Sequence, residues 1–132
     1  MIVDEIMQNL HKAYVPMPWH DARRTKINKE MVSDWCSKTR LTREALYDSI
    51  ALILAKGFQS GEFDFLFCDH VVNDLHTIID LRNDSHPEFF YNVFLAFDEG
   101  EYYHAHDGTV DPVEKYTRPQ IADILRKYFT NR

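Results

Sequence analysis

Glycine is scarce in this chain, with 4 glycines among 132 residues. Loops that bind phosphate groups need closely spaced glycines, because the backbone N–H groups must approach the ligand directly. The sequence contains no GxGxxG, GxxxxGK[ST], GxSxG or HExxH motif. We therefore expect neither a nucleotide-binding loop nor an active site built on one of these motifs.

Cysteine and long hydrophobic runs are also scarce. The 2 cysteines, Cys36 and Cys68, are too far apart for a CxxC pair, so we interpret both as small, reduced core residues. No apolar run approaches the roughly 20 residues needed to cross a bilayer. Acidic residues follow Met1 where a secretory signal needs basic ones. We expect a cytoplasmic protein without a membrane partner.

Positive charge is nearly missing from residues 57–114. Arg82 is the only lysine or arginine in this stretch, which also holds most of the phenylalanines and five of the 7 histidines. Its thirteen carboxylates belong to Glu62, Asp64, Asp69, Asp74, Asp80, Asp84, Glu88, Asp98, Glu99, Glu101, Asp107, Asp111 and Glu114. A stretch this apolar should be a folded acidic surface rather than a disordered tail. We therefore expect a basic or cationic partner, such as a basic protein.

The overall charge argues against nucleic acid as a partner. The chain has a formal net charge of −6 and a sequence pI of about 5.6, whereas binding to phosphate backbones depends on lysine and arginine. The length of 132 residues, 45% of them hydrophobic, is that of one globular domain, residues 1–132.

Apolar residues that recur every three or four positions predict about five helices. These stripes cover residues 3–14, 31–36, 46–54, 64–81 and 121–129. Asn28 and Thr42 are expected to cap the second and third helices, because their side-chain oxygens can accept from unpaired backbone N–H groups. Gly57 is expected to end the third helix in a left-handed conformation.

Residues 89–98 and 101–106 predict an antiparallel β-hairpin, so the expected fold class is α+β. Both segments are rich in aromatic and branched residues, and Asp98, Glu99 and Gly100 form a turn signal between them. If Gly100 closes a three-residue loop with a bulge, Tyr91, Val93, Leu95, Phe97, Tyr103 and Ala105 face the core. A two-residue loop would instead turn the histidines to that face. A short strand within residues 109–116, or dimerisation, could extend this small sheet.

Two candidate sites follow from this arrangement. The interaction face combines the polar side of the helix over residues 64–81 with aromatic residues of the hairpin: Asp69, Asn73, Asp74, His76, Asp80, Phe94 and Tyr102. The candidate metal site uses His104 and His106, because a two-residue spacing on a strand points both imidazoles the same way. Asp69, His70, Asp74 or His76 could supply a third ligand for a divalent metal ion.

The leading hypothesis is a non-catalytic interaction or inhibitor module that docks on a basic protein surface and needs no cofactor. One alternative is a small metal-dependent enzyme with its site between the helix and the hairpin. Another is a structural homodimer joined through the aromatic face of the sheet. The surrounding carboxylates are also expected to raise the pKa of some of the histidines His70, His76, His104 and His106.

Overall fold

The computed structural model describes residues 2–14 and 26–130, and these residues contain no β-strand. The helices, in chain order, are α1 (Val3–Ala13), α2 (Lys29–Thr39), α3 (Arg43–Ser60), α4 (Phe65–Leu81), α5 (Glu88–Asp98), the 3₁₀ turn η1 (Ala105–Asp107), the π-helical turn η2 (Val113–Thr117) and α6 (Arg118–Thr130). None of the described helices is long and apolar enough to cross a membrane.

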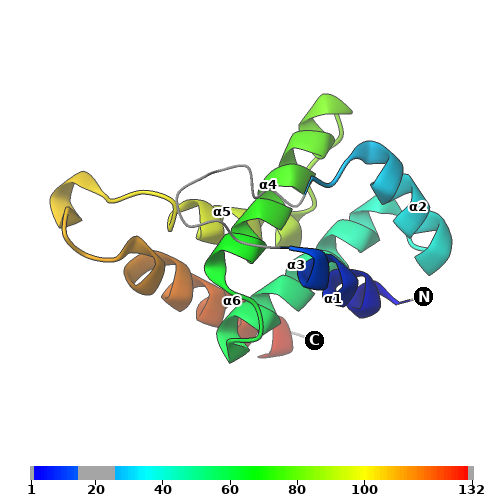
Figure 1. Ribbon diagram of the computed structural model, residues 1–132. Coiled ribbons are helices and arrows are strands. Elements are labelled where there is room, and N and C mark those ends of the chain that lie inside the picture. The colour runs from blue at the N-terminus through cyan, green and yellow to red at the C-terminus, as the bar shows by residue number, and fades with distance from the viewer. Residues whose placement is uncertain (1, 15–25, 131–132) are drawn as a thin grey trace.

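Helix α3 is the centre of the fold and contacts each of the other five α-helices (Figure 1). Its side chains at Leu46, Ile50 and Leu54 are fully buried, and so is Ala51 on a neighbouring side of the helix. A helix that is apolar on several sides must be covered on several sides. The other helices therefore surround α3 and share one hydrophobic core with it.

The predicted helix starts are confirmed by their capping hydrogen bonds. The backbone N–H of Met31 donates to Asn28 Oδ1 at 2.9 Å, and the N–H of Ala45 donates to Thr42 Oγ1 at 3.1 Å. Helix α4 also agrees with its predicted extent, since Asp64 caps it and it ends at Leu81. These starts follow from local chemistry, because a capping side chain satisfies N–H groups a few residues away in its own chain.

The predicted β-hairpin is wrong, and the α+β fold class is wrong with it. Residues of the first expected strand form α5, and those of the second lie in the following loop and η1. The buried residues of α5 are Phe90, Val93, Phe94, Ala96 and Phe97. Their spacing is that of a helix face. A short apolar run fits either a strand or a helix. Here the segment is helical because its apolar face is buried against α3 and α4.

The expected strand register fails for the same reason. The expected register places Tyr91 and Leu95 on the core face, but their side chains are exposed, whereas Phe94 from the opposite face is buried. The argument for a homodimer through the aromatic face of a sheet therefore no longer applies. Residues 109–116, considered as a third strand or a wrap, enter the π-helical turn η2.

The prediction that Gly57 ends α3 is wrong. The helix continues to Ser60, and Gly61 takes the left-handed conformation with φ of 87°. Gly57 is buried under the ring of Phe63, and a Cβ added at Gly57 would lie 2.3 Å from Phe63 Cδ2. Close packing between the helix and this ring is the reason for glycine at position 57.

Replacing this glycine tests the packing directly. Gly57→Ala should lower the free energy of unfolding by about 1–3 kcal/mol, because the buried Phe63 ring must move. This loss exceeds the gain of about 1 kcal/mol in helix propensity. Gly108→Ala is the control, since no described atom outside its chain neighbours lies within 4 Å of its added Cβ. Urea unfolding measures both, and an unchanged or raised stability of Gly57→Ala would contradict the proposed packing.

Candidate functional site

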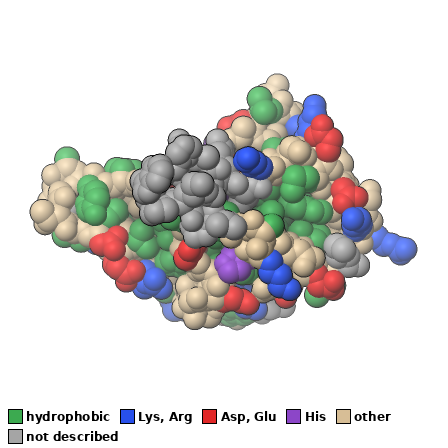
Figure 2. All heavy atoms as spheres, viewed as in Figure 1, with side chains coloured by type: hydrophobic (Ala, Val, Ile, Leu, Met, Phe, Trp, Pro, Cys, Tyr) green, Lys and Arg blue, Asp and Glu red, His purple; other side chains and the backbone are tan. Residues whose placement is uncertain are grey.

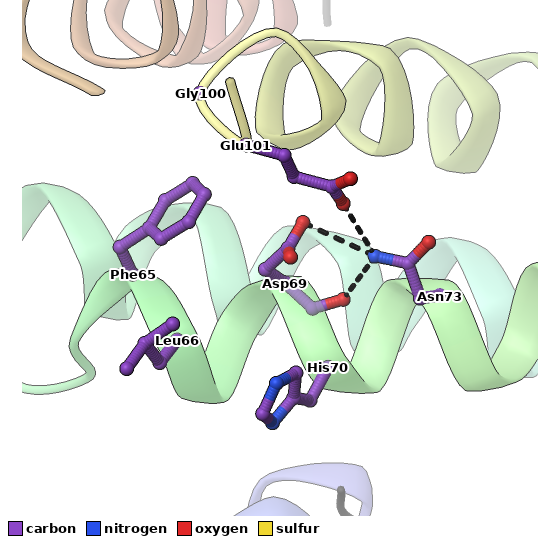
Figure 3. A pocket seen from close by; sticks show the side chains of 7 residues that line it. All are labelled: Phe65, Leu66, Asp69, His70, Asn73, Gly100 and Glu101. Atoms are coloured by element: carbon purple, nitrogen blue, oxygen red, sulfur yellow. Dashed lines mark hydrogen bonds between the residues drawn. The ribbon is translucent and has the colours of Figure 1, made fainter. Parts of the chain in front are cut away.

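Two groups of polar residues lie along α4 on the side that packs against α5. The group nearer the start of α4 joins Asp69 and Asn73 to Glu101, which follows the end of α5 (Figure 3). The second group lies near the end of α4 and consists of His76, Asp80 and His86, the last of which belongs to the turn before α5. Both groups depend on the packing of α4 against α5, since each combines residues from the two sides of that contact.

The first group lines an open cleft of about 440 Å³. The lining residues are Phe65, Leu66, Asp69, His70, Asn73, Gly100 and Glu101 (Figure 3). Five of these residues come from α4, and the other two come from the turn after α5. A Cβ at Gly100 would lie 2.3 Å from Thr117 Oγ1 and 2.8 Å from Phe65 Cε1, so glycine lets this turn approach α4 and the end of η2.

One amide group connects the two carboxylates of the cleft. The Asn73 Nδ2 group donates to Glu101 Oε2 at 2.8 Å, to Asp69 Oδ1 at 3.1 Å and to the backbone oxygen of Asp69 at 2.8 Å (Figure 3). An amide has two N–H donors, so three acceptors share them. The cleft therefore has more acceptors than donors, which is unfavourable for two ionised carboxylates.

The shortage of positive partners changes the protonation of Asp69. Its side chain is only 7% exposed. Burial, together with the nearby carboxylate of Glu101, raises the pKa of Asp69 from its ordinary 3.8 to about 9, while the hydrogen bond from Asn73 acts in the opposite direction. Asp69 is therefore protonated at neutral pH, and its O–H group can donate a hydrogen bond to the carboxylate of Glu101.

The acidic character continues along the end of α5. Burial raises the pKa of Asp98, and the charges of Glu101 and Glu99 raise it further. Within residues 2–14 and 26–130, no lysine or arginine forms an ion pair with Asp69 or Glu101. The cleft is thus an acidic site whose carboxylates are balanced by a proton and an amide rather than by a cation.

The rest of the cleft is apolar and aromatic. The ring of Phe65 is partly buried, and the side chain of Leu66 is 46% exposed. His70 also lines the cleft, but its ring points away from the two carboxyl groups (Figure 3). Its Nδ1 is 3.0 Å from the hydroxyl of Tyr14. The carboxylates accordingly lie beside an apolar surface that could cover the aliphatic part of a bound side chain.

The structure divides the predicted interaction face into separate parts. Asp74 points away from the cleft, because its Oδ2 accepts from the backbone N–H of Ile27 at 3.0 Å. Phe94 is buried, while Tyr102 is exposed and stacks on the ring of His104. On the face shown in Figure 2, acidic side chains form several small groups interspersed with apolar and basic ones. The carboxylates do not form one continuous patch on that face.

The predicted metal ligands do not come together as expected. His104 and His106 lie in a loop and the turn η1 rather than on a strand, and their rings are at 72° to each other. His104 Nε2 is 3.1 Å from the backbone oxygen of Glu99. His70 contacts α1 through Tyr14 instead. In the described part of the chain, the candidate ligands form no set of converging side chains: His70, Asp74, His104 and His106.

A different set of potential ligands does converge near the end of α4. One side-chain atom from each of His76, Asp80 and His86 lies within 4.8 Å of the others. Sequence reasoning identified the first two as part of a polar helix face but missed His86, which precedes Pro87 in the turn before α5. No periodicity marks a residue in a turn. The expected hairpin places Glu101 at the start of a strand, so the sequence gives no sign of its place in the cleft.

The expected rise in histidine pKa is wrong for His76. Burial against α5 lowers its pKa below the ordinary value of 6.5, and this outweighs the opposite effect of the Asp80 carboxylate. The ring stacks on Phe94 with centroids 4.1 Å apart, so one face of the imidazole is desolvated. Desolvation disfavours the charged form of histidine. His76 is therefore neutral near pH 7.

Comparison of the chain with protein-family models, with curated proteins and with solved structures found no match. The function must therefore be argued from the geometry and electrostatics of these two groups of residues.

The raised pKa of Asp69 predicts how the stability of the protein depends on pH. Between about pH 4 and pH 9 the folded state holds a proton on Asp69 that the unfolded state has lost, so this residue lowers stability as pH rises through that window. Asp69→Asn keeps the shape without the ionisable group. It should raise the free energy of unfolding by roughly 1–3 kcal/mol at pH 7 and flatten its decrease toward pH 9.

Urea unfolding at pH 5, 7 and 9 measures this effect. Asp123→Asn is the matched control, because the contacts with Arg126 and Lys127 lower the pKa of Asp123 and its substitution should not raise stability. If Asp69→Asn were less stable than the natural protein at pH 9, Asp69 would not be a destabilising buried acid.

Proposed function

We propose that the protein is a non-catalytic interaction module that docks on the basic surface of another protein. The cleft formed by Asp69, Asn73 and Glu101 receives a lysine or arginine side chain of that partner. The observation that carries this proposal is the burial of the Asp69 carboxyl beside Glu101 without an ion pair to a described lysine or arginine. A cation placed in the cleft would supply the positive charge that the site lacks.

The energetics support a functional reason for Asp69. A buried acid with a pKa near 9 makes the free protein less stable at neutral pH than a neutral residue of the same shape would. Residues that reduce stability in this way occur at sites where a ligand supplies the compensating interaction. Asp69 and Glu101 together could accept a guanidinium group through several hydrogen bonds, while Asn73 keeps their oxygens in place.

The shape of the cleft supports an extended basic side chain rather than a small cation. Lysine and arginine carry their charge at the end of an aliphatic stem. Phe65 and Leu66 offer an apolar surface beside the carboxylates, and Leu66 is substantially exposed in the free protein. The acids Asp98 and Glu99 near the end of α5 add negative potential, which would speed the approach of a basic partner.

The first test is affinity capture from cell lysate with matched variants. The cleft variant Asp69→Asn/Glu101→Gln removes two acids from the cleft, and the control Asp4→Asn/Glu5→Gln removes two exposed acids from the start of α1. We expect the natural chain and the control to retain one basic partner at low salt. The cleft variant should capture at least tenfold less of this partner. High salt should weaken the binding, because the attraction is electrostatic.

The second test uses the proton on Asp69. A cation in the cleft favours the ionised carboxylate, so binding at pH 7 must release this proton. Calorimetry with the purified partner should show an affinity that rises by up to about tenfold per pH unit between pH 6 and pH 9. Asp69→Asn should bind more weakly and remove this dependence. Equal capture by the cleft variant, or affinity independent of both Asp69 and pH, would contradict the proposal.

A further inference from the structure

The turn between α4 and α5 brings His86 next to two residues at the end of α4. His76 and Asp80 are four positions apart on the helix, so they lie one above the other on one face. His76 Nδ1 is 3.4 Å from Asp80 Oδ2, and His86 Nε2 is 2.9 Å from Asp80 Oδ1. Two imidazole nitrogens and a carboxylate therefore point toward the same small region.

These distances suit a first-row transition metal. Zinc lies about 2.0–2.2 Å from histidine nitrogen and carboxylate oxygen, so neighbouring ligand atoms in a tetrahedral site are roughly 3.3–3.6 Å apart. His76 Nδ1 is 3.4 Å from Asp80 Oδ2 and His86 Nε2 is 2.9 Å from Asp80 Oδ1, and one ligand atom from each of the three residues lies within 4.8 Å of the others. Small side-chain movements would thus be enough for the three residues to hold an ion.

Aromatic packing holds both imidazoles in place. The His76 ring stacks on the rings of Phe94 and His86, with centroids 4.1 Å and 4.5 Å away. His86 also packs against Phe90 and Tyr91 of α5. The rings of His76 and His86 are tilted by 29°, which allows both to be directed toward one point. Rigid rings reduce the entropy lost when a metal binds.

The accessible atoms leave room for the ion and for a further ligand. The Asp80 side chain is 58% exposed, whereas the side chains of His76 and His86 are 27% and 19% exposed. His86 Nδ1 is buried, so Nε2 is the nitrogen that an ion can reach. Two histidines and one carboxylate with a remaining position open to water form a donor set that zinc and similar metals accept.

We propose that His76, Asp80 and His86 bind one divalent transition-metal ion of the zinc type at the junction of α4 and α5. This site is separate from the acidic cleft and does not depend on the proposed docking function. Its ligands are hard and borderline donors without thiolates, which favours divalent metals with imidazole affinity over calcium or magnesium. A bound ion would link the end of α4 to the turn that starts α5.

Titration of the full-length, metal-free protein with Zn²⁺ in a calorimeter tests this site. We expect one ion bound per chain through these residues, with the affinity lowered at least tenfold in Asp80→Asn and in His86→Gln. The matched control is His104→Asn/His106→Asn, which removes two imidazoles outside the site and should keep the natural affinity within about twofold. Asp80 lies on the surface, so Asp80→Asn is expected to fold normally.

Thermal and urea unfolding provide an independent readout. With free Zn²⁺ at 100 times the dissociation constant, the ratio of folded to unfolded protein should rise about 100-fold for the natural chain and the control. It should rise much less for Asp80→Asn and His86→Gln. No zinc binding, binding unchanged in Asp80→Asn, or binding lost in His104→Asn/His106→Asn would each overturn the proposal.

Discussion

The packing of α5 against α4 and α3 is the interaction on which both sites depend. Phe90, Val93 and Phe97 of α5 are fully buried, and burial of each large apolar side chain contributes about 1.5–3 kcal/mol. This contact places the turn after α5 beside the start of α4 and the turn before α5 beside its end. Glu101 reaches Asn73 of α4 because α5 is held there, and the turn before α5 brings His86 to Asp80.

The same packing offsets the electrostatic cost of the acidic cleft. Removing Asp69 from water disfavours its ionised form, and Glu101 increases this effect. The cost falls on a single carboxyl group that can take up a proton, whereas the apolar gain is distributed over the whole contact of α5 with its neighbours. The fold can therefore contain this electrostatically unfavourable site.

The helix starts and apolar stripes could be predicted because they depend on neighbours in the sequence. Asn28 caps α2 through an N–H three residues away, whatever the rest of the chain does. Helix α5 could not be predicted so simply, because its run of aromatic and branched residues fits two periodicities. The polar members of α4 were recognised as candidates, but their partners in the turns were not. A turn residue acquires its neighbours from the packing of the helices that it joins.

The sequence by itself determined the helical stripes of α1 to α4 and α6, the caps of α2 and α3, and the excess of carboxylates over cations in residues 57–114. These properties arise from local hydrogen bonding, side-chain spacing and composition. Only the tertiary structure decided that α5 is a helix, that Asp69 meets Glu101, and that His86 joins His76 and Asp80. These contacts depend on how α5 and the turns at its two ends pack against α4, which no local pattern records.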